Sequence, residues 1–396
     1  FANSESREFD ELVARVGKEA FMDITRVLPD ASYSLAKMLY TRRVAKKPVW
    51  KYLFVASYLS YCLSGKAACD ESLACRSLLY DVKANCWSKP LLDASGIAQA
   101  QLPEVIPAGG VIGTILPELA AQFGLRTDVK IVSGCHDQIV NALGAGVCAC
   151  GEAVDTSGTC ECITPLFAAM PDEAFIRSNF ACVPYLDRLG YVTYAYNISG
   201  GSVVKWYRDH LRDQAEKEGC SIYDLLNREC PAEPTNLLVL PFLQGMGGTP
   251  DVRPEATGLI SGLTTSTTMP QLYRALLEGL CYEMQYNLEK LGEGNVALSR
   301  LYACGGGARS SVWLQIKADV WGREIVPVRT EETGALGSAI LGFAAVTGEE
   351  KVCKLAQRFT QHGDPILPDP RHHAYYQKQY ETYKKLREFS MTLYPQ

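Results

Sequence analysis

Long apolar runs are missing from this sequence. The longest apolar stretch, Trp50–Leu63, contains Lys51 and is shorter than the ~20 residues that cross a bilayer, so it predicts a buried amphipathic helix. A dominant sign of charge is missing too, because 39 Lys and Arg stand against 44 Asp and Glu, and 39 − 44 gives a net charge of −5. Nothing in this balance indicates nucleic acid or an anionic membrane as a partner.

Several familiar catalytic and metal-binding motifs are absent as well. No Gly-Lys-Ser/Thr follows the glycines at 305–307, which excludes a P-loop, and no Gly-x-Ser-x-Gly elbow occurs. The pairs Cys148/Cys150 and Cys160/Cys162 have CxC rather than the CxxC spacing of most structural zinc sites. We interpret them as buried free thiols. A zinc-dependent hydrolase is a further alternative, which metal analysis would test.

Cysteine usage and the first residue bear on where the protein works. Fifteen cysteines in a chain without a signal peptide indicate reduced thiols and predict a cytoplasmic protein. The sequence starts with Phe1 rather than Met, so we expect that some upstream sequence has been removed or is not represented.

The 396 residues predict about two domains of ordinary size. Helical patterns dominate residues 1–150, and strand–turn units alternate with helices in residues 151–396. This alternation predicts an α/β architecture with a boundary near residue 150.

The segment Leu301–Gly322 is a candidate ligand site. An apolar run ends in three glycines, and a helical stripe of Val312, Ile316 and Val320 follows. The first turn of a helix has unpaired N–H groups and a positive dipole end, so backbone there can bind a phosphate. A purely structural strand-to-helix turn needs the same glycines, and these residues alone leave both interpretations open.

Asp137 is a candidate catalytic residue. The apolar strand Lys130–Ser133 delivers it at the carboxyl end of a strand, where open α/β sheets bind ligands. A carboxylate there can accept a proton from a substrate hydroxyl or contact a metal, and it can equally be the N-cap of the following helix. His136 is interpreted as a packing or orienting group, since no second His stands at metal spacing.

The tripeptide Ser157-Gly158-Thr159 joins two short predicted strands. Its flexible backbone and two hydroxyls can hold a phosphate. A plain β-hairpin turn is the alternative for these residues.

The order of these segments is more specific than any one of them. GCHDQ at 134–138, SGT at 157–159, the run from Gly258 to Gly279 (GLISGL, then QL, Ala275, Glu278 and Gly279) and ACGGGARSSVWLQIKAD resemble the FGGY family of carbohydrate kinases over nearly the whole chain. The resemblance implies an α/β, actin-like ATPase (ribonuclease H-like) two-domain fold. It also implies transfer of the γ-phosphoryl group of MgATP to a sugar or polyol hydroxyl. The expected division is 1–150 for the sugar-binding domain and 151–396 for the nucleotide-binding domain.

The resemblance also implies roles for single residues. Asp137 matches the catalytic base, with an indirect contact to Mg²⁺, and Gln138 and His136 lie where the substrate binds. Asn3-Ser-Glu5-Ser-Arg7 partly matches a substrate motif, with Glu5 and Arg7 as contacts. The implied nucleotide-binding residues are Gly158, Thr159, Gly279, Gly305, Gly306, Gly307, Ala308 and Ser310.

Three departures from the family pattern matter, and the smallest is Cys160, which stands where Ser or Thr is common after the SGT turn. The opening Asp-x-Gly-Thr phosphate loop of the family has no counterpart here, so we expect an incomplete amino-terminal domain and little or no turnover from these 396 residues alone. The usual Gly-Glu-Arg-x-Pro loop reads Gly245-Met-Gly-Gly-Thr-Pro250. A non-catalytic sugar- or nucleotide-binding protein is therefore the alternative to a kinase. The expected partner is a small sugar or polyol, in a xylulokinase-like or fuculokinase-like branch, with a homodimer as one assembly considered.

Overall fold

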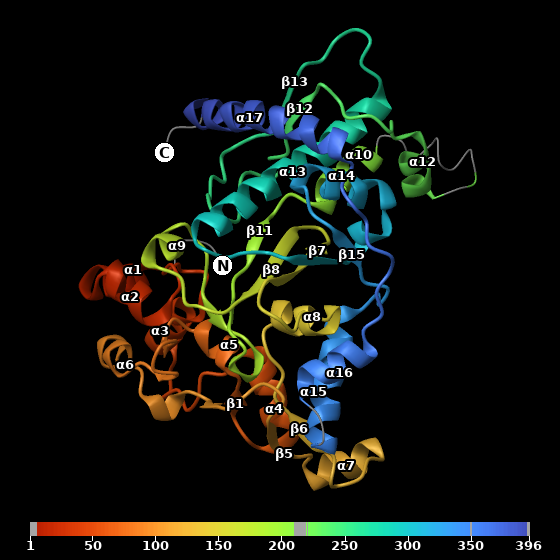
Figure 1. The fold of residues 1–396 in the computed structure, drawn as a ribbon. Helices are drawn as coiled ribbons and strands as arrows, with labels where there is room; N and C mark the ends of the chain where they lie inside the picture. The colour runs from red at the N-terminus through yellow and green to blue at the C-terminus, as the bar shows by residue number, and fades with distance from the viewer. Residues whose placement is uncertain (1–5, 210–218, 220, 349–350, 394–396) are drawn as a thin grey trace. The chain divides into compact units, whose positions relative to one another are not determined.

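The computed structural model describes residues 6–209, 219, 221–348 and 351–393, which form two compact units (Figure 1). The segments of unit 1 are Phe1–Cys150, Leu166–Thr193 and Thr333–Phe359, and those of unit 2 are Gly151–Pro165, Tyr194–Glu332 and Thr360–Gln396. Each unit is thus assembled from three separate stretches of chain. The domain boundary near residue 150 stays a prediction.

Unit 1 is mainly helical, and its strands are short. Strands β1 and β4 pair in parallel, whereas β2–β3, β5–β6 and β9–β10 are antiparallel pairs. The helices of unit 1 are α1 (Arg7–Val16), α2 (Lys18–Thr25), α3 (Ser34–Val44), α4 (Val55–Ser64), α5 (Glu71–Cys75), α6 (Lys89–Ser95), η2 (Gln99–Gln101), α7 (Pro117–Phe123), α8 (Asp137–Ala145), α9 (Glu173–Arg177), η3 (Leu186–Arg188), α15 (Thr333–Thr347) and α16 (Val352–Phe359). Its strands are β1 (Ala68–Cys69), β2 (Tyr80–Asp81), β3 (Cys86–Trp87), β4 (Glu104–Val105), β5 (Val111–Thr114), β6 (Lys130–Val132), β9 (Val183–Pro184) and β10 (Tyr191–Val192).

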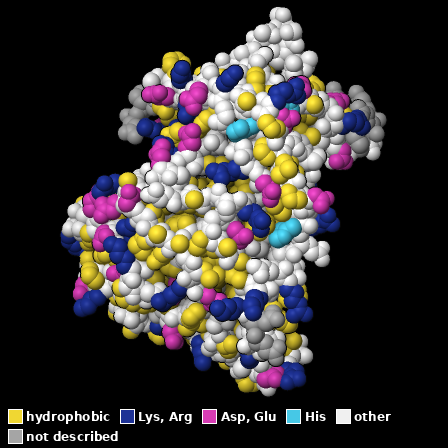
Figure 2. Space-filling model, viewed as in Figure 1, with side chains coloured by type: hydrophobic (Ala, Val, Ile, Leu, Met, Phe, Trp, Pro, Cys, Tyr) yellow, Lys and Arg dark blue, Asp and Glu magenta, His cyan; other side chains and the backbone are white. Residues whose placement is uncertain are grey.

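The helix predicted at Trp50–Leu63 differs from the prediction in start and burial. It begins at Val55, because the Tyr52 N–H donates to the Gln101 carbonyl (2.8 Å) and Phe54 is extended. The prediction of a buried helix is wrong, since Val55 is 79% and Leu59 57% exposed. Figure 2 shows hydrophobic side chains gathered on one face of unit 1.

Helices α8 and α15 are the closest-packed pair of unit 1. A Cβ added to Gly144 would lie 1.8 Å from the Thr333 carbonyl oxygen, and one added to Gly337 would lie 2.0 Å from that of Val140. The Thr333 hydroxyl donates to Asn141 in the same contact. Glycines on both helices therefore let the two backbones touch.

Unit 2 is built on a sheet with the strand order β15–β14–β7–β8, and β11 also pairs with β8. Strand β14 runs parallel to both neighbours, whereas β7 and β8 form an antiparallel hairpin. The strands are β7 (Glu152–Ser157), β8 (Glu161–Phe167, whose last two residues belong to unit 1), β11 (Ala195–Asn197), β12 (Leu238–Leu240), β13 (Leu259–Ser261), β14 (Arg300–Cys304) and β15 (Ile325–Pro327). The helices are α10 (Gly201–Arg208), α12 (Ile222–Glu229), α13 (Met269–Glu293), η4 (Gly306–Arg309), α14 (Ser311–Trp321) and α17 (Pro370–Leu393).

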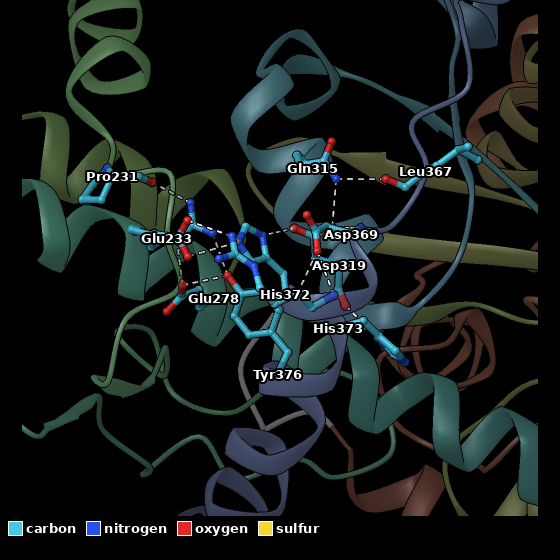
Figure 3. A network of polar contacts seen from close by, with 12 residues as sticks. Pro231, Glu233, Glu278, Gln315, Asp319, Leu367, Asp369, His372, His373 and Tyr376 are labelled. Atoms are coloured by element: carbon cyan, nitrogen blue, oxygen red, sulfur yellow. Dashed lines mark hydrogen bonds and ion pairs between the residues drawn. The ribbon is translucent and has the colours of Figure 1, made fainter.

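A polar network around Asp319 joins helix α14 to the start of α17 (Figure 3). The Asp319 side chain is fully buried and accepts hydrogen bonds from Gln315 Nε2 and from the Asp369 N–H, both at 2.8 Å. His372 Nδ1 lies 3.1 Å from the same carboxylate, and His373 Nδ1 lies 2.8 Å from the Asp319 carbonyl. The start of α17 is thereby fixed against α14.

The predicted strand, glycine turn and helix of Leu301–Gly322 are confirmed, with the 3-10 helix η4 inserted between β14 and α14. Along the described parts of the chain, every helix is too short or too polar to cross a membrane.

Candidate functional site

The candidate residues fall into one group in each unit, and each group is described by itself. In unit 1 the loop GCHDQ leads into α8, whose first residue is Asp137. The Asp137 side chain is 82% exposed. His136 rather than Asp137 occupies the N-cap position and its Nδ1 accepts the Gln138 N–H at 3.3 Å, while Asp137 Oδ1 accepts the same N–H at 2.7 Å. The Asp137 carboxylate is therefore presented to solvent at a helix start.

The loop before Asp137 is tied to α5 by two side chains. Buried Asp70 caps α5, where it accepts N–H groups from Ser72 (2.8 Å) and Leu73 (3.1 Å). The Ser72 hydroxyl donates to Asp70 at 2.5 Å and accepts the His136 N–H at 2.8 Å. This chain of hydrogen bonds fixes the backbone one residue before Asp137. The sequence analysis missed both Asp70 and Ser72.

His136 is a half-buried, uncharged neighbour of Asp137. Its Nδ1 lies 3.0 Å from Asp137 Oδ1, and its side chain is 18% exposed. Burial lowers the pKa of His136 to about 4, and the Asp137 charge opposes this only in part. His136 is therefore neutral at physiological pH, which agrees with its interpretation as a packing and orienting group.

The low pKa of His136 predicts an acid-sensitive fold. The unfolded chain takes up this proton near pH 6.5 and the native chain only near pH 4, so the stability due to neutral His136 is complete above pH 6.5 and is lost as pH falls below it. Between pH 7 and pH 5 we expect the free energy of unfolding to fall by about 1–2 kcal/mol more in the parent than in His136→Asn, which keeps an N-capping side chain. Urea unfolding at both pH values measures this difference. Equal losses would contradict it.

A cavity of about 250 Å³ adjoins this loop. Its walls include Asp70, Glu71, Cys135, Ile139 and Arg188. Burial raises the pKa of Asp70 to about 6 despite its three hydrogen bonds. The cavity thus combines acidic groups with a cation, a mixture that suits a small polar molecule.

Glu5 and Arg7 are the two substrate contacts predicted near the start of the chain. Glu5 lies outside the described residues. Arg7 is the first residue of α1; its side chain is 82% exposed, and its Nε lies 2.8 Å from Glu11 Oε1. Glu11 is thus a local partner for Arg7, one turn along the same helix.

In unit 2, Ser157-Gly158-Thr159 forms the predicted hairpin turn between β7 and β8. The Gly158 N–H donates to the Cys160 carbonyl (2.9 Å). The Gly158 and Thr159 carbonyls accept the Gly201 and Ser202 N–H groups at the start of α10 (2.8 and 3.1 Å). The hairpin turn is confirmed, and it lies against a helix N-terminus.

The glycine turn after β14 lies beside that hairpin. Gly305 has φ +84°, and a Cβ there would lie 2.7 Å from the Ser157 carbonyl oxygen. A Cβ on Gly307 would lie 2.6 Å from the Ser157 side chain and 2.7 Å from the Trp313 ring. The glycines are therefore required where the two turns touch, whether or not a ligand binds.

Both turns open onto a cavity of about 880 Å³ that lies wholly in unit 2. Of the eight predicted nucleotide-binding residues, five line it: Gly158, Thr159, Gly306, Gly307 and Ser310. Gly305, Ala308 and Gly279 are not in its wall. Gly279 on α13 instead allows close approach of β12, since a Cβ there would lie 2.3 Å from the Val239 carbonyl oxygen.

The wall of this cavity also holds residues that were not predicted from the sequence. Trp206, Tyr223, Tyr273 and Trp313 line it with aromatic rings. Ser310 caps α14 and donates to Asn227 Oδ1 at 2.8 Å, which orients that amide at the cavity wall. Aromatic faces and an oriented amide are the groups that a planar heterocycle needs.

The cysteine pairs correct one prediction. Cys150 and Cys160 are exposed and Cys148 and Cys162 are half-buried, so the interpretation as buried thiols is wrong for all four. The alternation argument needs a strand, but β7 begins only at Glu152 and Cys160 lies in the hairpin turn. Within the ranges that the structure describes, no three His, Cys, Asp or Glu side chains gather as metal ligands would.

Comparison with known protein families matches both parts of the chain. Residues 4–144 match the N-terminal domain, and residues 154–346 the C-terminal domain, of the FGGY family of carbohydrate kinases. A xylulose kinase from Escherichia coli (strain K12) is 28% identical over 393 residues, covering 96% of this chain and 77% of the relative. A gluconokinase from Bacillus licheniformis is 30% identical over 306 residues, covering 74% and 58%.

Solved structures give the same result for the fold. A crystal structure described as a xyloylose kinase from Brucella ovis has a TM-score of 0.85 at 25% identity, covering 98% of this chain and 79% of that one. A xylulose kinase from Rhodospirillum rubrum has a TM-score of 0.87 at 24% identity, covering 99% and 79%. The α/β, actin-like two-domain fold is therefore confirmed. The expected incompleteness of the amino-terminal domain stays a prediction.

Proposed function

Because this chain belongs to the FGGY family of carbohydrate kinases, we propose that it transfers the γ-phosphoryl group of MgATP to a hydroxyl of a sugar or polyol, with Asp137 as the general base. One observation carries the base assignment. The Asp137 carboxylate is 82% exposed at the start of α8, on a loop held by Ser72 and Asp70. A general base needs to be accessible and held on an ordered loop, and the exposure of Asp137 and the bonded backbone before it support this role.

The chemistry asks little else of the protein. The substrate hydroxyl gives its proton to Asp137 as its oxygen attacks the γ-phosphorus, and ADP leaves. Neutral His136 beside the carboxylate adds no positive charge that would weaken the base. Gln138, next on α8, contributes an amide for the substrate hydroxyls.

The cavity of unit 2 fits a nucleotide. Thr159 brings a hydroxyl to the phosphates, on a turn that Gly158 lets approach them closely. The glycine turn and Ser310 hold the adenosine end, and the aromatic wall receives the base. The nucleotide phosphates would hold Mg²⁺, which would neutralise their charge, and Asp137 would contact it only indirectly.

The substrate is proposed from the names of the relatives. Several are described as xylulose kinases and two as gluconokinases. The proposed substrate is therefore a ketose, as expected for a xylulokinase-like or fuculokinase-like branch, or an aldonic acid. A non-catalytic binding protein is the second candidate, because Gly245–Pro250 lacks the Glu and Arg usual in the family. We also propose that the protein acts in the cytoplasm and forms a homodimer.

A substrate panel tests the proposal. The protein expressed from its complete reading frame is incubated with MgATP and xylulose, ribulose, fuculose, gluconate or glycerol, and ADP release is measured. We expect one or two ketoses to be phosphorylated, and the same sugars to raise Tm together with a non-hydrolysable ATP analogue. Thermal stabilisation without ADP release from any sugar would favour the binding protein instead.

A further inference from the structure

Lys317 is a buried cation next to the proposed nucleotide cavity, and nothing in the proposed mechanism uses it. It lies on α14, and its side chain is fully buried. Its ammonium pairs with Asp155 on β7 and, at 2.8 Å, with Glu161 on β8, both of which are also fully buried. Bringing three charges out of water is costly, so their presence calls for a reason beyond packing.

The same ammonium holds the turn that faces the cavity. Lys317 Nζ donates to the Ser157 hydroxyl, and the Ser157 hydroxyl lies 3.3 Å from both Asp155 oxygens. Ser157 begins the Ser157–Thr159 turn and itself lines the cavity. The ion pairs to Asp155 and Glu161 clamp the two strands of the hairpin at the point where the turn leaves them.

Two indole rings enclose the ammonium. Its Nζ lies 4.7 Å from the centroid of the Trp313 ring and 5.4 Å from that of Trp321. Trp313 also lines the cavity. The Lys317 charge therefore acts on two walls of the nucleotide cavity, the hairpin turn through Ser157 and the aromatic wall through Trp313.

We propose that Lys317, with Asp155 and Glu161, is a positioning residue that holds the Ser157–Thr159 turn in its nucleotide-binding conformation. This inference rests on the proposed function only in so far as the ligand is a nucleotide. The position of the turn is a property of the protein alone. Lys317 does not line the cavity, so it acts through Ser157 and Trp313 and not by touching the ligand.

The test must separate loss of positioning from loss of folding. Lys317→Met alone leaves two buried carboxylates unpaired, which endangers the fold. The triple variant Asp155→Asn/Glu161→Gln/Lys317→Met removes all three charges and keeps side chains of nearly the same size and shape. It is compared with Ser157→Ala, which removes only the hydroxyl. The surface variant Lys378→Met, on α17 of unit 2 and outside the wall of this cavity, controls for the loss of one positive charge.

Two measurements are made on each variant. Amide hydrogen exchange of the peptide covering residues 155–162, without ligand, reports the position of the turn. We expect at least about tenfold faster exchange in the triple variant at a parent-like Tm. Binding of Mg²⁺ with a non-hydrolysable ATP analogue is then expected to weaken about tenfold in the triple variant and to change little in Lys378→Met. The effects of the triple variant and of Ser157→Ala on this affinity should be strongly non-additive when the two are combined.

The outcomes separate this inference from the proposed function. Parent-like exchange and parent-like affinity in a folded triple variant would show that the charges are only structural, and would overturn the inference. If the parent protein binds no nucleotide, the proposed nucleotide site fails, and the exchange of residues 155–162 still decides the role of Lys317.

The surplus carboxylate in this cluster gives a separate stability prediction. Burial raises the pKa of Glu161 to about 7, with Asp155 adding to the rise and Lys317 opposing it. Cys281 also faces the cluster, and burial raises the pKa of its thiol well above the usual range. Since the unfolded Glu161 releases its proton near pH 4.5, its contribution to stability declines as pH rises from 4.5 through about 7. From pH 6 to pH 8 the urea midpoint should fall further in the parent than in Glu161→Gln. Equal shifts in the two proteins would contradict the prediction.

Discussion

Asp137→Asn is expected to lower kcat for sugar phosphorylation by about 10²–10⁴-fold, while KM for the sugar changes little. The amide has the size of the carboxylate but cannot take the hydroxyl proton. The Asp137 side chain is exposed, and the Ser72 hydroxyl holds the loop through the backbone of His136. The loop should therefore keep its conformation in the variant. Steady-state kinetics with MgATP and the best sugar of the panel measure both constants in the complete reading-frame product.

Asp93→Asn is the matched control for this experiment. Asp93 is an exposed carboxylate of unit 1 that pairs with Lys89 at 2.8 Å on the same helix. Along the sequence it is distant from the residues proposed to act on the substrate. It should leave kcat unchanged. An unchanged kcat in Asp137→Asn would remove Asp137 from the base role, and a raised sugar KM with normal kcat would make it a binding residue.

Gly337→Ala is expected to destabilise unit 1 by about 3 kcal/mol, near the upper end of overpacking effects. The added methyl group would lie 2.0 Å from the Val140 carbonyl oxygen, and backbone cannot move aside as a flexible side chain does. Helix α15 would have to move away from α8, the helix that begins with Asp137. We therefore expect a lower urea midpoint and a lower kcat together.

The control lies on the same helix. A Cβ on Gly342 meets nothing within 4 Å, so Gly342→Ala should stabilise α15 by about 0.5–1 kcal/mol through helix propensity alone. The two Gly→Ala substitutions lie five residues apart. If one lowers the free energy of unfolding and the other raises it, the contact with α8, and not the loss of glycine itself, causes the destabilisation. Shifts of the same sign would disprove the close contact.

The parts of the fold that sequence predicted well are those specified by neighbouring residues. An apolar run, three glycines and a stripe at helical spacing are sufficient to predict β14, the turn and α14. The same local logic failed for Trp50–Leu63, because a hydrogen bond from Tyr52 to the distant Gln101 keeps the first residues extended. It failed for Cys148 and Cys150 because the strand that the argument assumed starts later.

The candidate site divides in the same way. Asp137, Thr159 and Gly307 stand in short motifs and could be predicted. Lys317 could not, since its partner Asp155 is 162 residues away and only the folded sheet brings them together. One signal was available, because Lys317 and Asp319 are charges within the apolar run from Ile316 to Trp321, and a charge at such a position needs a buried partner. Asn227 and the aromatic wall carried no comparable signal.

The division of each unit into three segments has a consequence for how the chain reaches its native state. Helix α8 packs on α15, and the bond between Asn141 and Thr333 spans 192 residues. Unit 2 likewise needs α17, which ends at Leu393. During synthesis from the amino terminus, unit 1 therefore cannot complete its core until residues 333–359 have left the ribosome, and unit 2 not until α17 has done so. Long-range closure of this kind slows folding and leaves apolar faces open meanwhile, so this protein is expected to depend on chaperones more than a chain of two sequential domains.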